Sequence, residues 1–237
     1  MLTVPAVALA ELVSEPLDFV WIDLEHGALD PADVQPLGVA ARAAGCATLA
    51  RLPGSECSRL PAILDAGVDG VVAPRVELAV QARRLVDRLH HPPRGSRGFA
   101  ARRAAAYGRG GAAHEPLCVA QIETAAGVEA AGQIAAVDGV DAVVVGCADL
   151  ALSLDGTPEP SSQRVLDAVV HVQRAAKAAR IVSGIAGPDD PRLLLELAGA
   201  ASTMLVCSAD VRIYARAVDD AVARLRALVP EGLGVGA

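Results

Sequence analysis

The stretch CVAQIETAAGVEAAGQIAAVDGVDAVVVGC, residues 118–147, holds two mostly apolar runs on either side of a segment with helical spacing. The runs, residues 118–123 and 142–147, are short and rich in β-branched side chains, which is typical of parallel strands buried on both faces. Residues 127–137 between them have the pattern of a helix. The stretch therefore predicts one strand–helix–strand unit of a parallel sheet.

The same alternation continues on both sides of this unit and indicates further strand–helix units. Together with a short candidate at residues 1–4, the strands number eight, as in a (β/α)₈ barrel. The alternative, a doubly wound nucleotide-binding sheet, would need a GxGxxG or Walker-type loop, which the sequence lacks. We therefore predict an α/β fold, a (β/α)₈ TIM barrel with a short or incomplete first strand, as a single domain over residues 1–237. The other strand-like runs are residues 19–24, 47–52, 70–75, 182–187 and 203–208, and the other helix-like segments are residues 30–45, 76–91, 162–179 and 191–200.

Composition restricts the class of protein. With 237 residues and 53% hydrophobic content, the chain is large enough for one sizeable core. Its net charge of -7 argues against nucleic acid and anionic membranes as partners, because both require a basic face. The 5 cysteines have no CxxC spacing, so neither a disulfide framework nor a zinc site is indicated, and a reducing cytoplasm is expected. No apolar run approaches the roughly 18 to 20 residues of a membrane span.

Polar side chains recur where the predicted strands end. FVWIDLEHG, residues 19–27, passes from an apolar strand directly into two acids and a histidine. In a barrel the carboxyl ends of all strands share one face, and functional residues gather there. We expect that face to carry a site. The side chains at these positions are Asp23, Glu25, His26, Arg51, Arg75, Gln121, Glu123 and Asp149.

Glu123 and Asp149 follow consecutive predicted strands, so they are expected to lie close together. Two carboxylates, with the remaining positions left to water and a chelating substrate, describe a weakly held Mg²⁺ or Mn²⁺ site. The alternative is that both form ordinary salt bridges to arginine. The spacing leaves both interpretations open.

His26, three residues after Asp23, fits a general base that a carboxylate orients, and the alternative is a histidine that caps the following helix. Arg51 fits a clamp on a carboxylate or enolate oxygen, or a structural ion-pair partner. The Gly- and Arg-rich residues 92–116 are expected to form a loop over the mouth of the barrel or at a subunit contact. The arginines of this segment either attract an anionic substrate or lie in a solvated loop or at a subunit interface; they are Arg94, Arg97, Arg102, Arg103 and Arg109.

Six motifs together resemble the class II, metal-dependent pyruvate aldolases of the HpcH/HpaI family. They occur in the order of that family, and the resemblance extends from about Pro5 to Leu225. The motifs are DLEHG (23–27), LARLPG (49–54), ILDAGVDGVVAPRV (63–76), HPPRGSRGF (91–99), QIET (121–124) and GCADLALSL (146–154).

The resemblance implies a metal site and a proton-transfer pair. Glu123 and Asp149 would bind the divalent metal, Mg²⁺ or Mn²⁺, with Co²⁺ as a third candidate. Arg51 would contact the 2-oxo group of the substrate and stabilise its enolate. His26, paired with Asp23, would handle protons.

The resemblance also assigns residues around the substrate and a quaternary structure. Asp65 would be a supporting or interface residue near the histidine–aspartate pair, and Gln121 would support the pyruvate pocket. The implied assembly is a homo-oligomer, a trimer or a hexamer, in which the last helix, about residues 209–228, exchanges with a neighbouring subunit. The residues implied to hold the pyruvate carboxylate are Gly146, Cys147, Ala148 and Asp149.

The implied activity is that of a carbon–carbon lyase, which splits a 4-hydroxy-2-oxo acid into pyruvate and an aldehyde or joins them. One alternative is a macrophomate-synthase-like oxaloacetate decarboxylase or another biosynthetic enzyme that couples the enolate to a different electrophile. The other is a noncatalytic barrel with an interaction role. Against the latter, decay would not be expected to spare Asp23, His26, Arg51, Glu123 and Asp149 together.

The sequence departs from the family pattern in three respects: the loop of residues 147–151, the first strand and the Arg-rich loop. Cys147 stands where the family usually has proline, and Ala151 stands where it usually has serine. The first strand is nearly absent, and the Arg-rich loop is shorter than usual. We expect these differences to affect the choice of substrate more than metal binding.

Overall fold

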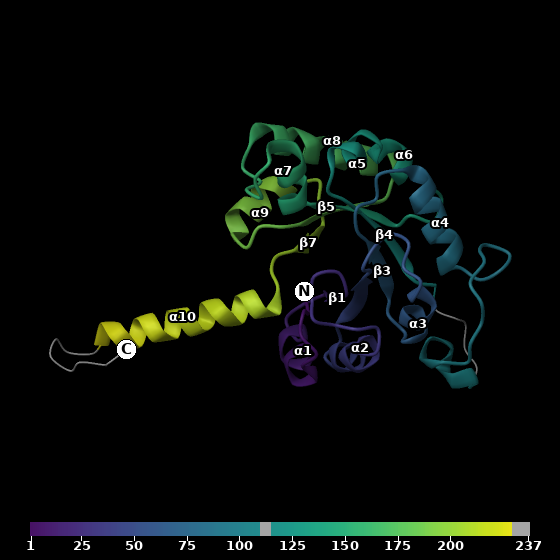
Figure 1. Ribbon diagram of the computed structural model, residues 1–237, viewed down its shortest axis with the longest axis horizontal. Coiled ribbons are helices and arrows are strands. Elements are labelled where there is room, and N and C mark those ends of the chain that lie inside the picture. The colour runs from purple at the N-terminus through teal and green to yellow at the C-terminus, as the bar shows by residue number, and fades with distance from the viewer. Residues whose placement is uncertain (110–114, 229–237) are drawn as a thin grey trace.

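A curled sheet of parallel strands forms the centre of the molecule (Figure 1). The computed structural model describes residues 1–109 and 115–228, and within them 7 strands lie side by side in sequence order. Each overlaps one of the seven predicted runs, and β4 begins one residue before its run, so those predictions and a TIM-barrel-like α/β fold are confirmed. The strands are β1 (Phe19–Asp23), β2 (Ala47–Arg51), β3 (Gly70–Ala73), β4 (Leu117–Ile122), β5 (Ala142–Gly146), β6 (Val182–Ala186) and β7 (Met204–Val206).

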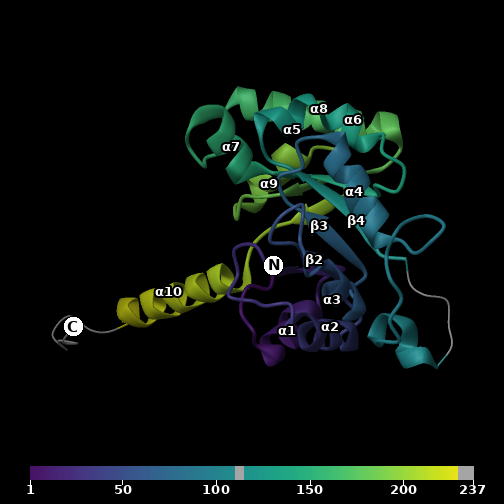
Figure 2. The same cartoon turned by 45° about the vertical axis from the view of Figure 1, so that its right-hand side comes forward.

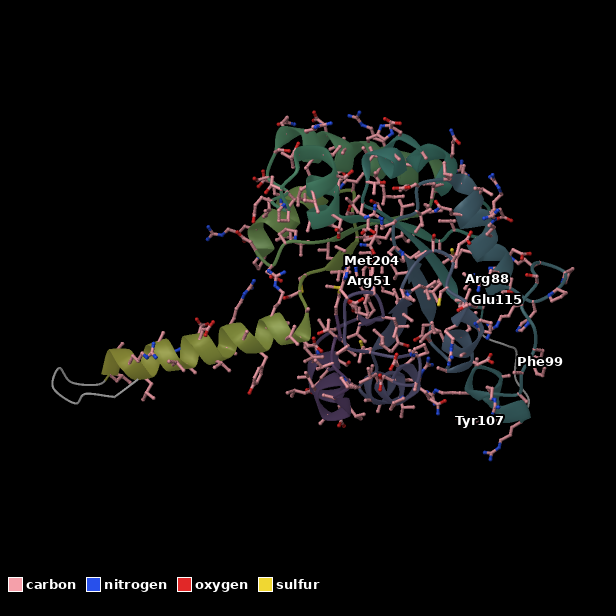
Figure 3. The ribbon with its side chains drawn as sticks, in the orientation of Figure 1. Arg51, Arg88, Phe99, Tyr107, Glu115 and Met204 are labelled. Atoms are coloured by element: carbon pink, nitrogen blue, oxygen red, sulfur yellow. The ribbon has the colours of Figure 1, made fainter. Side chains whose placement is uncertain are left out.

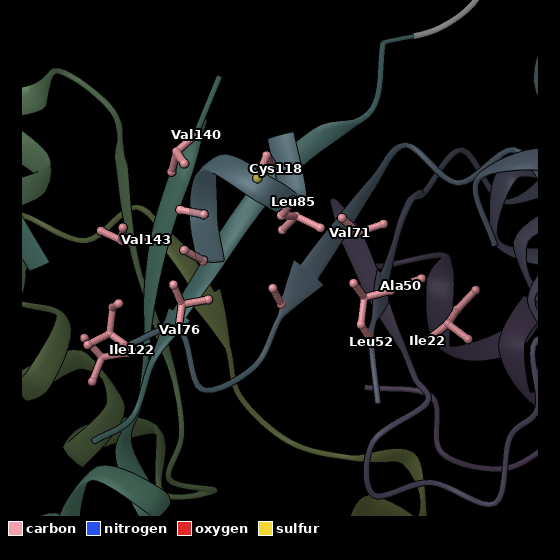
Figure 4. Close-up of a cluster of buried hydrophobic side chains, with 14 of the residues drawn as sticks. Ile22, Ala50, Leu52, Val71, Val76, Leu85, Cys118, Ile122, Val140 and Val143 are labelled. Atoms are coloured by element: carbon pink, nitrogen blue, oxygen red, sulfur yellow. The ribbon is translucent and has the colours of Figure 1, made fainter. Parts of the chain in front are cut away.

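Both faces of the sheet are apolar, which is why the strands are continuous hydrophobic runs rather than alternating ones. Side chains on the concave face, including Trp21, Val72 and Val144, pack into a small inner cluster. Side chains on the convex face, such as Ile22 and Val71, pack against the surrounding helices and form the larger cluster (Figure 4). Because successive residues of a strand point to opposite faces, Trp21 and Asp23 both point to the inside.

Helices cover the convex face of the sheet (Figures 1 and 2). Four predicted helical segments are confirmed, and the segment at 127–137 forms parts of two short helices instead of one. Side chains at the first helical turn help to set the boundaries, as Ser162 accepts a hydrogen bond from the backbone N–H of Val165. The predicted helices are α2 (Val34–Ala43), α4 (Ala79–Leu89), α5 (Ala125–Glu129), α6 (Ala131–Ala135), α8 (Gln163–Ala179) and α9 (Pro191–Ala198).

Other helices lie in segments that the sequence pattern did not identify as helical. They are α1 (Val7–Ser14), α3 (Leu60–Asp65), α7 (Cys147–Asp155) and the 3₁₀ helix η1 (Arg103–Gly108). Helix η1 belongs to the loop predicted at residues 92–116, of which residues 110–114 lie outside the described residues.

The last helix, α10 (Asp210–Leu228), extends away from the rest of the chain (Figures 1 and 2). It is amphipathic in sequence, yet Tyr214 is 68% exposed and Leu225 is 66% exposed. Its apolar side chains therefore face solvent in the single chain.

The first three residues lie between the two edges of the sheet. Leu2 forms an isolated parallel bridge with Ile22 of β1. On the other side, the carbonyl of Met1 accepts a hydrogen bond of 2.9 Å from the backbone N–H of Asp210, beyond β7. Across residues 1–109 and 115–228, no helix is both long and apolar enough to cross a membrane.

Candidate active site

The centre of the site is an ion pair between Arg51 and Asp23. Asp23 is the last residue of β1 and Arg51 the last of β2, and the parallel register places them directly opposite each other. Arg51 Nε donates to Asp23 Oδ1 at 2.9 Å, and its Nη2 donates to Oδ2 at 2.6 Å. Both residues are buried. Such a two-pronged contact fixes the plane of the guanidinium as well as its position.

Two further groups surround this arginine. Its Nη1 lies 3.1 Å from Glu25 Oε2, and its Cζ lies 6.0 Å from the centre of the Trp21 ring. Trp21 is the inward-facing residue that precedes Asp23 on the same face of β1. In Figure 3 Arg51 lies near the middle of the molecule, close to Met204 in that view.

The expected pairing between the His26 ring and Asp23 is replaced by a different arrangement. Asp23 Oδ1 accepts hydrogen bonds from the backbone N–H groups of Glu25 and His26, at 3.1 and 3.3 Å. Asp23 therefore stabilises the turn after β1 and does not orient the His26 ring. The carboxylate of Asp23 is directed to Arg51 because of the strand register. His26 Nε2 lies 3.8 Å from Glu25 Oε2, and 65% of its side chain is exposed. His26 is thus a ring at the mouth of the site, next to Glu25.

Glu123, the residue after β4, is held by two neighbouring elements. Its Oε1 accepts a hydrogen bond of 2.8 Å from the backbone N–H of Arg75, and its Oε2 accepts a hydrogen bond of 2.6 Å from Gln121 Nε2. Arg75 has a φ of 51°, a left-handed conformation that is strained for a non-glycine residue. A Cβ on Gly146 would lie 2.6 Å from both Glu123 Oε2 and Gln121 Nε2, so only glycine allows this close approach.

Negative charge is in excess at this site. Burial, together with the nearby charges of Glu25 and Asp149, raises the pKa of Glu123 to about 7, although the hydrogen bond from the Arg75 backbone N–H and the charge of Arg51 act in the opposite direction. Burial also raises the pKa of Glu25, with contributions from Asp23 and Asp149 that oppose those of Arg51 and His26. One guanidinium, already paired with Asp23, stands against these carboxylates. The electrostatics therefore favour an additional cation.

The residues present fit a divalent metal with few protein ligands. Glu123 and Asp149 influence each other electrostatically, and each oxygen of Glu123 accepts one hydrogen bond, which leaves lone pairs free. Gln121 Oε1 is buried and has no hydrogen-bond partner within residues 1–109 and 115–228. In the same ranges no group of three or more His, Cys, Asp and Glu side chains is arranged to hold a metal. A two-carboxylate site of this kind leaves the other positions to water and substrate.

Helix α7 begins at the same edge of the sheet. Gly146 precedes it, and Asp149 lies in its first turn. The backbone N–H groups of a first helical turn lack partners within the helix and attract anions. The Cys147 side chain is fully buried, and burial raises the pKa of its thiol to about 12, so it is an inert core residue. Ala151 is also fully buried.

Asp65 differs from its expected position near His26. It is the last residue of α3, just before the turn into β3, and therefore lies toward the amino ends of the strands. Its carboxylate accepts a hydrogen bond of 3.2 Å from Arg97. The direction of α3 explains this difference. A helix between two parallel strands runs back from the carboxyl end of the first strand to the amino end of the next, so its last residue lies at the amino-end face of the barrel.

The sequence identifies Glu25 and Arg75 as strand-end side chains without a role, and alternation along the strand places Trp21 on the same face as Asp23. Glu25 contacts both Arg51 and His26, Trp21 lies beneath Arg51, and Arg75 contributes its backbone N–H to Glu123. No pattern in the sequence indicates the left-handed backbone at Arg75.

The fold and the site define a TIM-barrel-like α/β protein that concentrates carboxylates around one arginine at the carboxyl ends of its strands. The family model described as HpcH/HpaI aldolase/citrate lyase matches residues 5–203. The chain belongs to this family.

Named relatives extend the likeness. The hydroxypyruvate/pyruvate aldolase of Rhizorhabdus wittichii is 36% identical over 183 residues, which cover 75% of this chain and 72% of that protein. The 4-hydroxy-2-oxovalerate aldolase of Novosphingobium aromaticivorans is 32% identical over 229 residues, with 92% and 85% covered. Among solved structures, an HpcH/HpaI aldolase/citrate lyase family protein from Burkholderia cenocepacia has a TM-score of 0.88 at 31% identity, with 95% of this chain and 92% of that chain covered.

Proposed function

We propose that the chain is a class II aldolase that cleaves or forms a carbon–carbon bond next to pyruvate, with a 2-oxo acid and an aldehyde as its small-molecule partners. The observation that carries this proposal is the carboxylate cluster around Glu123 and Asp149 beside a fixed arginine. The relatives named above support it, since they are described as aldolases of hydroxypyruvate, pyruvate and 4-hydroxy-2-oxovalerate.

Glu123 and Asp149 would hold the metal, Mg²⁺ or Mn²⁺, with Co²⁺ as a third candidate. When bound, the metal would supply a Lewis acid that polarises the 2-oxo group and stabilises negative charge on it. Gln121 supports this arrangement through its hydrogen bond to Glu123. The excess of negative charge at the site is what supports the metal proposal.

The residues of the chain would bind and orient the substrate. The backbone N–H groups of Cys147, Ala148 and Asp149, at the start of α7, would hold the carboxylate of the oxo acid. Arg51 would donate to the 2-oxo oxygen. Because Asp23 holds the guanidinium by two prongs, little reorganisation is needed when charge develops on that oxygen.

His26 would move the proton. Its ring lies at the mouth of the site next to Glu25, where it would exchange a proton with the methyl group of bound pyruvate. Asp23 would act indirectly, since it orients the His26 backbone and holds Arg51. We propose Asp65, at the other end of the barrel, as a residue of a subunit contact.

We also propose that residues 1–3 take the place of the first barrel strand. The bridge of Leu2 to β1 and the bond of Met1 to Asp210 support this position between the two edges. The cytoplasm is the proposed compartment, supported by five cysteines that are all free thiols.

The proposed assembly is a homo-oligomer, a trimer or hexamer, that buries the exposed apolar side chains of α10 against a neighbouring subunit. We expect Leu225→Glu to shift the protein to a smaller species in size-exclusion chromatography with light scattering, because a charge would enter an apolar contact. Arg224→Glu, which changes an adjacent polar residue, is the matched control. A monomer in the unaltered protein would contradict the proposal.

The activity is tested by incubating the protein with pyruvate in D₂O, with and without Mg²⁺ or Mn²⁺, and following the methyl signal by NMR. We expect metal-dependent loss of that signal, because an enolate-forming site exchanges the methyl protons whatever the aldehyde is. Exchange no faster than with metal alone would contradict the proposal and favour a noncatalytic barrel.

A further inference from the structure

A cavity of about 300 Å³ lies toward the amino ends of the strands, away from the candidate active site. Arginines from three separate segments line it: Arg42 from α2, Arg97 from the loop after α4, and Arg103 from η1. Tyr107, also from η1, forms part of its rim and is more than half exposed. Figure 3 shows Tyr107 at the edge of the molecule, well separated from Arg51.

The positive groups of this cavity are only partly neutralised. Arg42 Nη2 contacts Asp69 Oδ1 at 2.9 Å and the carbonyl of Gly67 at 3.1 Å. Arg97 is paired with Asp65 through a single hydrogen bond. The side-chain stem of Arg103 lies along Gly67. Its guanidinium forms no hydrogen bond or ion pair with any of residues 1–109 and 115–228.

Arg97 supplies an independent observation. Its side chain is only 6% exposed, and its Nε is buried without a hydrogen-bond partner in the described ranges. A buried donor without a partner is unfavourable because it has lost its hydrogen bonds to water, and more so when it is charged. An acceptor that enters the cavity would remove this cost.

We propose that this cavity is a second, noncatalytic site that binds a small carboxylate or phosphate anion. Planar guanidinium groups match the oxygens of both anions, and arginines from three directions would enclose one. Leu64 and Pro116 provide apolar walls. At about 300 Å³ the cavity lies at the lower end of ligand sites, which favours a compact anion over a nucleotide.

The test is calorimetric titration of the full-length protein with inorganic phosphate at constant ionic strength. We expect saturable binding that Arg103→Ala weakens by about tenfold or more, the worth of one charge-assisted contact. Arg102→Ala is the matched control, because Arg102 is the exposed neighbour and does not line the cavity. Thermal melts of each variant verify that it is folded, and Arg97→Met is a second variant that should weaken binding similarly.

A titration with succinate distinguishes carboxylate from phosphate as the preferred anion. It is made in the Glu123→Gln background, so that the candidate active site does not contribute. Absence of saturable binding for both anions, or equal weakening by Arg102→Ala and Arg103→Ala, would overturn the proposal. Because it does not depend on Glu123, phosphate binding in that background would persist even if the aldolase proposal failed.

Discussion

Two arginine–aspartate pairs, at opposite ends of the barrel, use the same chemistry in different ways. In the pair of Arg51 and Asp23, both carboxylate oxygens are bound and both side chains are buried. In the pair of Arg97 and Asp65, one hydrogen bond of 3.2 Å joins the residues, and Arg97 Nε has no partner within the described ranges. The first guanidinium is fixed, whereas the second retains a donor for another acceptor.

The surroundings of the two pairs differ in the sign of the remaining charge. Around Arg51 further carboxylates accumulate, and neighbouring negative charges contribute to the raised pKa values of Glu25 and Glu123. Around Arg97 further arginines accumulate. The comparison suggests that one barrel presents a cation-binding end and an anion-binding end, and each of the following changes tests one part of it.

The largest effect is expected for Glu123→Gln. The substitution keeps the size of the side chain but removes a charged metal ligand, so we expect Mn²⁺ binding to weaken by more than ~100-fold, beyond what loss of a supporting residue causes. Metal-dependent methyl exchange of pyruvate should fall to background. Calorimetry measures the affinity, and Glu129→Gln, on the exposed side of α5, is the control. Unchanged Mn²⁺ affinity would refute the assignment of Glu123.

His26→Ala is expected to reduce turnover by about 10²- to 10⁴-fold, the usual contribution of a general base. Metal binding should remain intact, because His26 lies at the mouth and contacts Glu25 rather than Glu123. Steady-state kinetics and Mn²⁺ calorimetry on the same preparation separate the two effects. His171→Ala, at an exposed position of α8, is the control. A loss of turnover within about twofold would rule out the proton-transfer role.

Much of the site at the carboxyl ends of the strands could be predicted from the sequence, whereas little of the cavity at their amino ends could. Each strand is a continuous apolar run, so the polar positions at its end or just after it, such as Arg51 and Glu123, were identifiable. The pairing of Asp23 with Arg51 depends on the register between β1 and β2, which no local pattern contains. Proximity in sequence suggested His26 as the partner of Asp23 instead.

The arginine-lined cavity combines Arg42, Arg97 and Arg103, which lie far apart in sequence or in an irregular loop. Nothing in their spacing indicates that they meet. Helix α1 was also not predicted, because Val7–Ser14 is short, mainly apolar and without a capping side chain, so it lacks the features that mark a helix in a sequence.

The two pairs should differ in their contribution to stability. Asp23→Asn breaks a buried, two-pronged pair, so we expect the free energy of unfolding to fall by about 3 kcal/mol. Asp65→Asn weakens one longer bond between the buried Arg97 and a partly exposed carboxylate, and we expect a smaller loss of about 1.5 kcal/mol, the contribution of one hydrogen bond to a charged group. Urea unfolding in EDTA measures both. Equal losses would show that the two pairs are energetically alike, which would break the comparison.

The smallest effect is the pH dependence of the first pair. Burial alone would raise the pKa of Asp23, but the hydrogen bonds and the charge of Arg51 outweigh it, and the net pKa is lowered. As the pH falls, the carboxylate of Asp23 therefore becomes protonated at a higher pH in the unfolded state than in the folded state. The stability advantage of the unaltered protein over Asp23→Asn should be fully present above the unfolded-state pKa of about 3.9. It should then decline as the pH falls through the lower folded-state pKa.

Urea titrations of both proteins in EDTA at a series of pH values measure the difference. An advantage that grows on acidification would mean that Arg51 does not hold Asp23 in its charged form, and the cation-binding end would lose its fixed guanidinium.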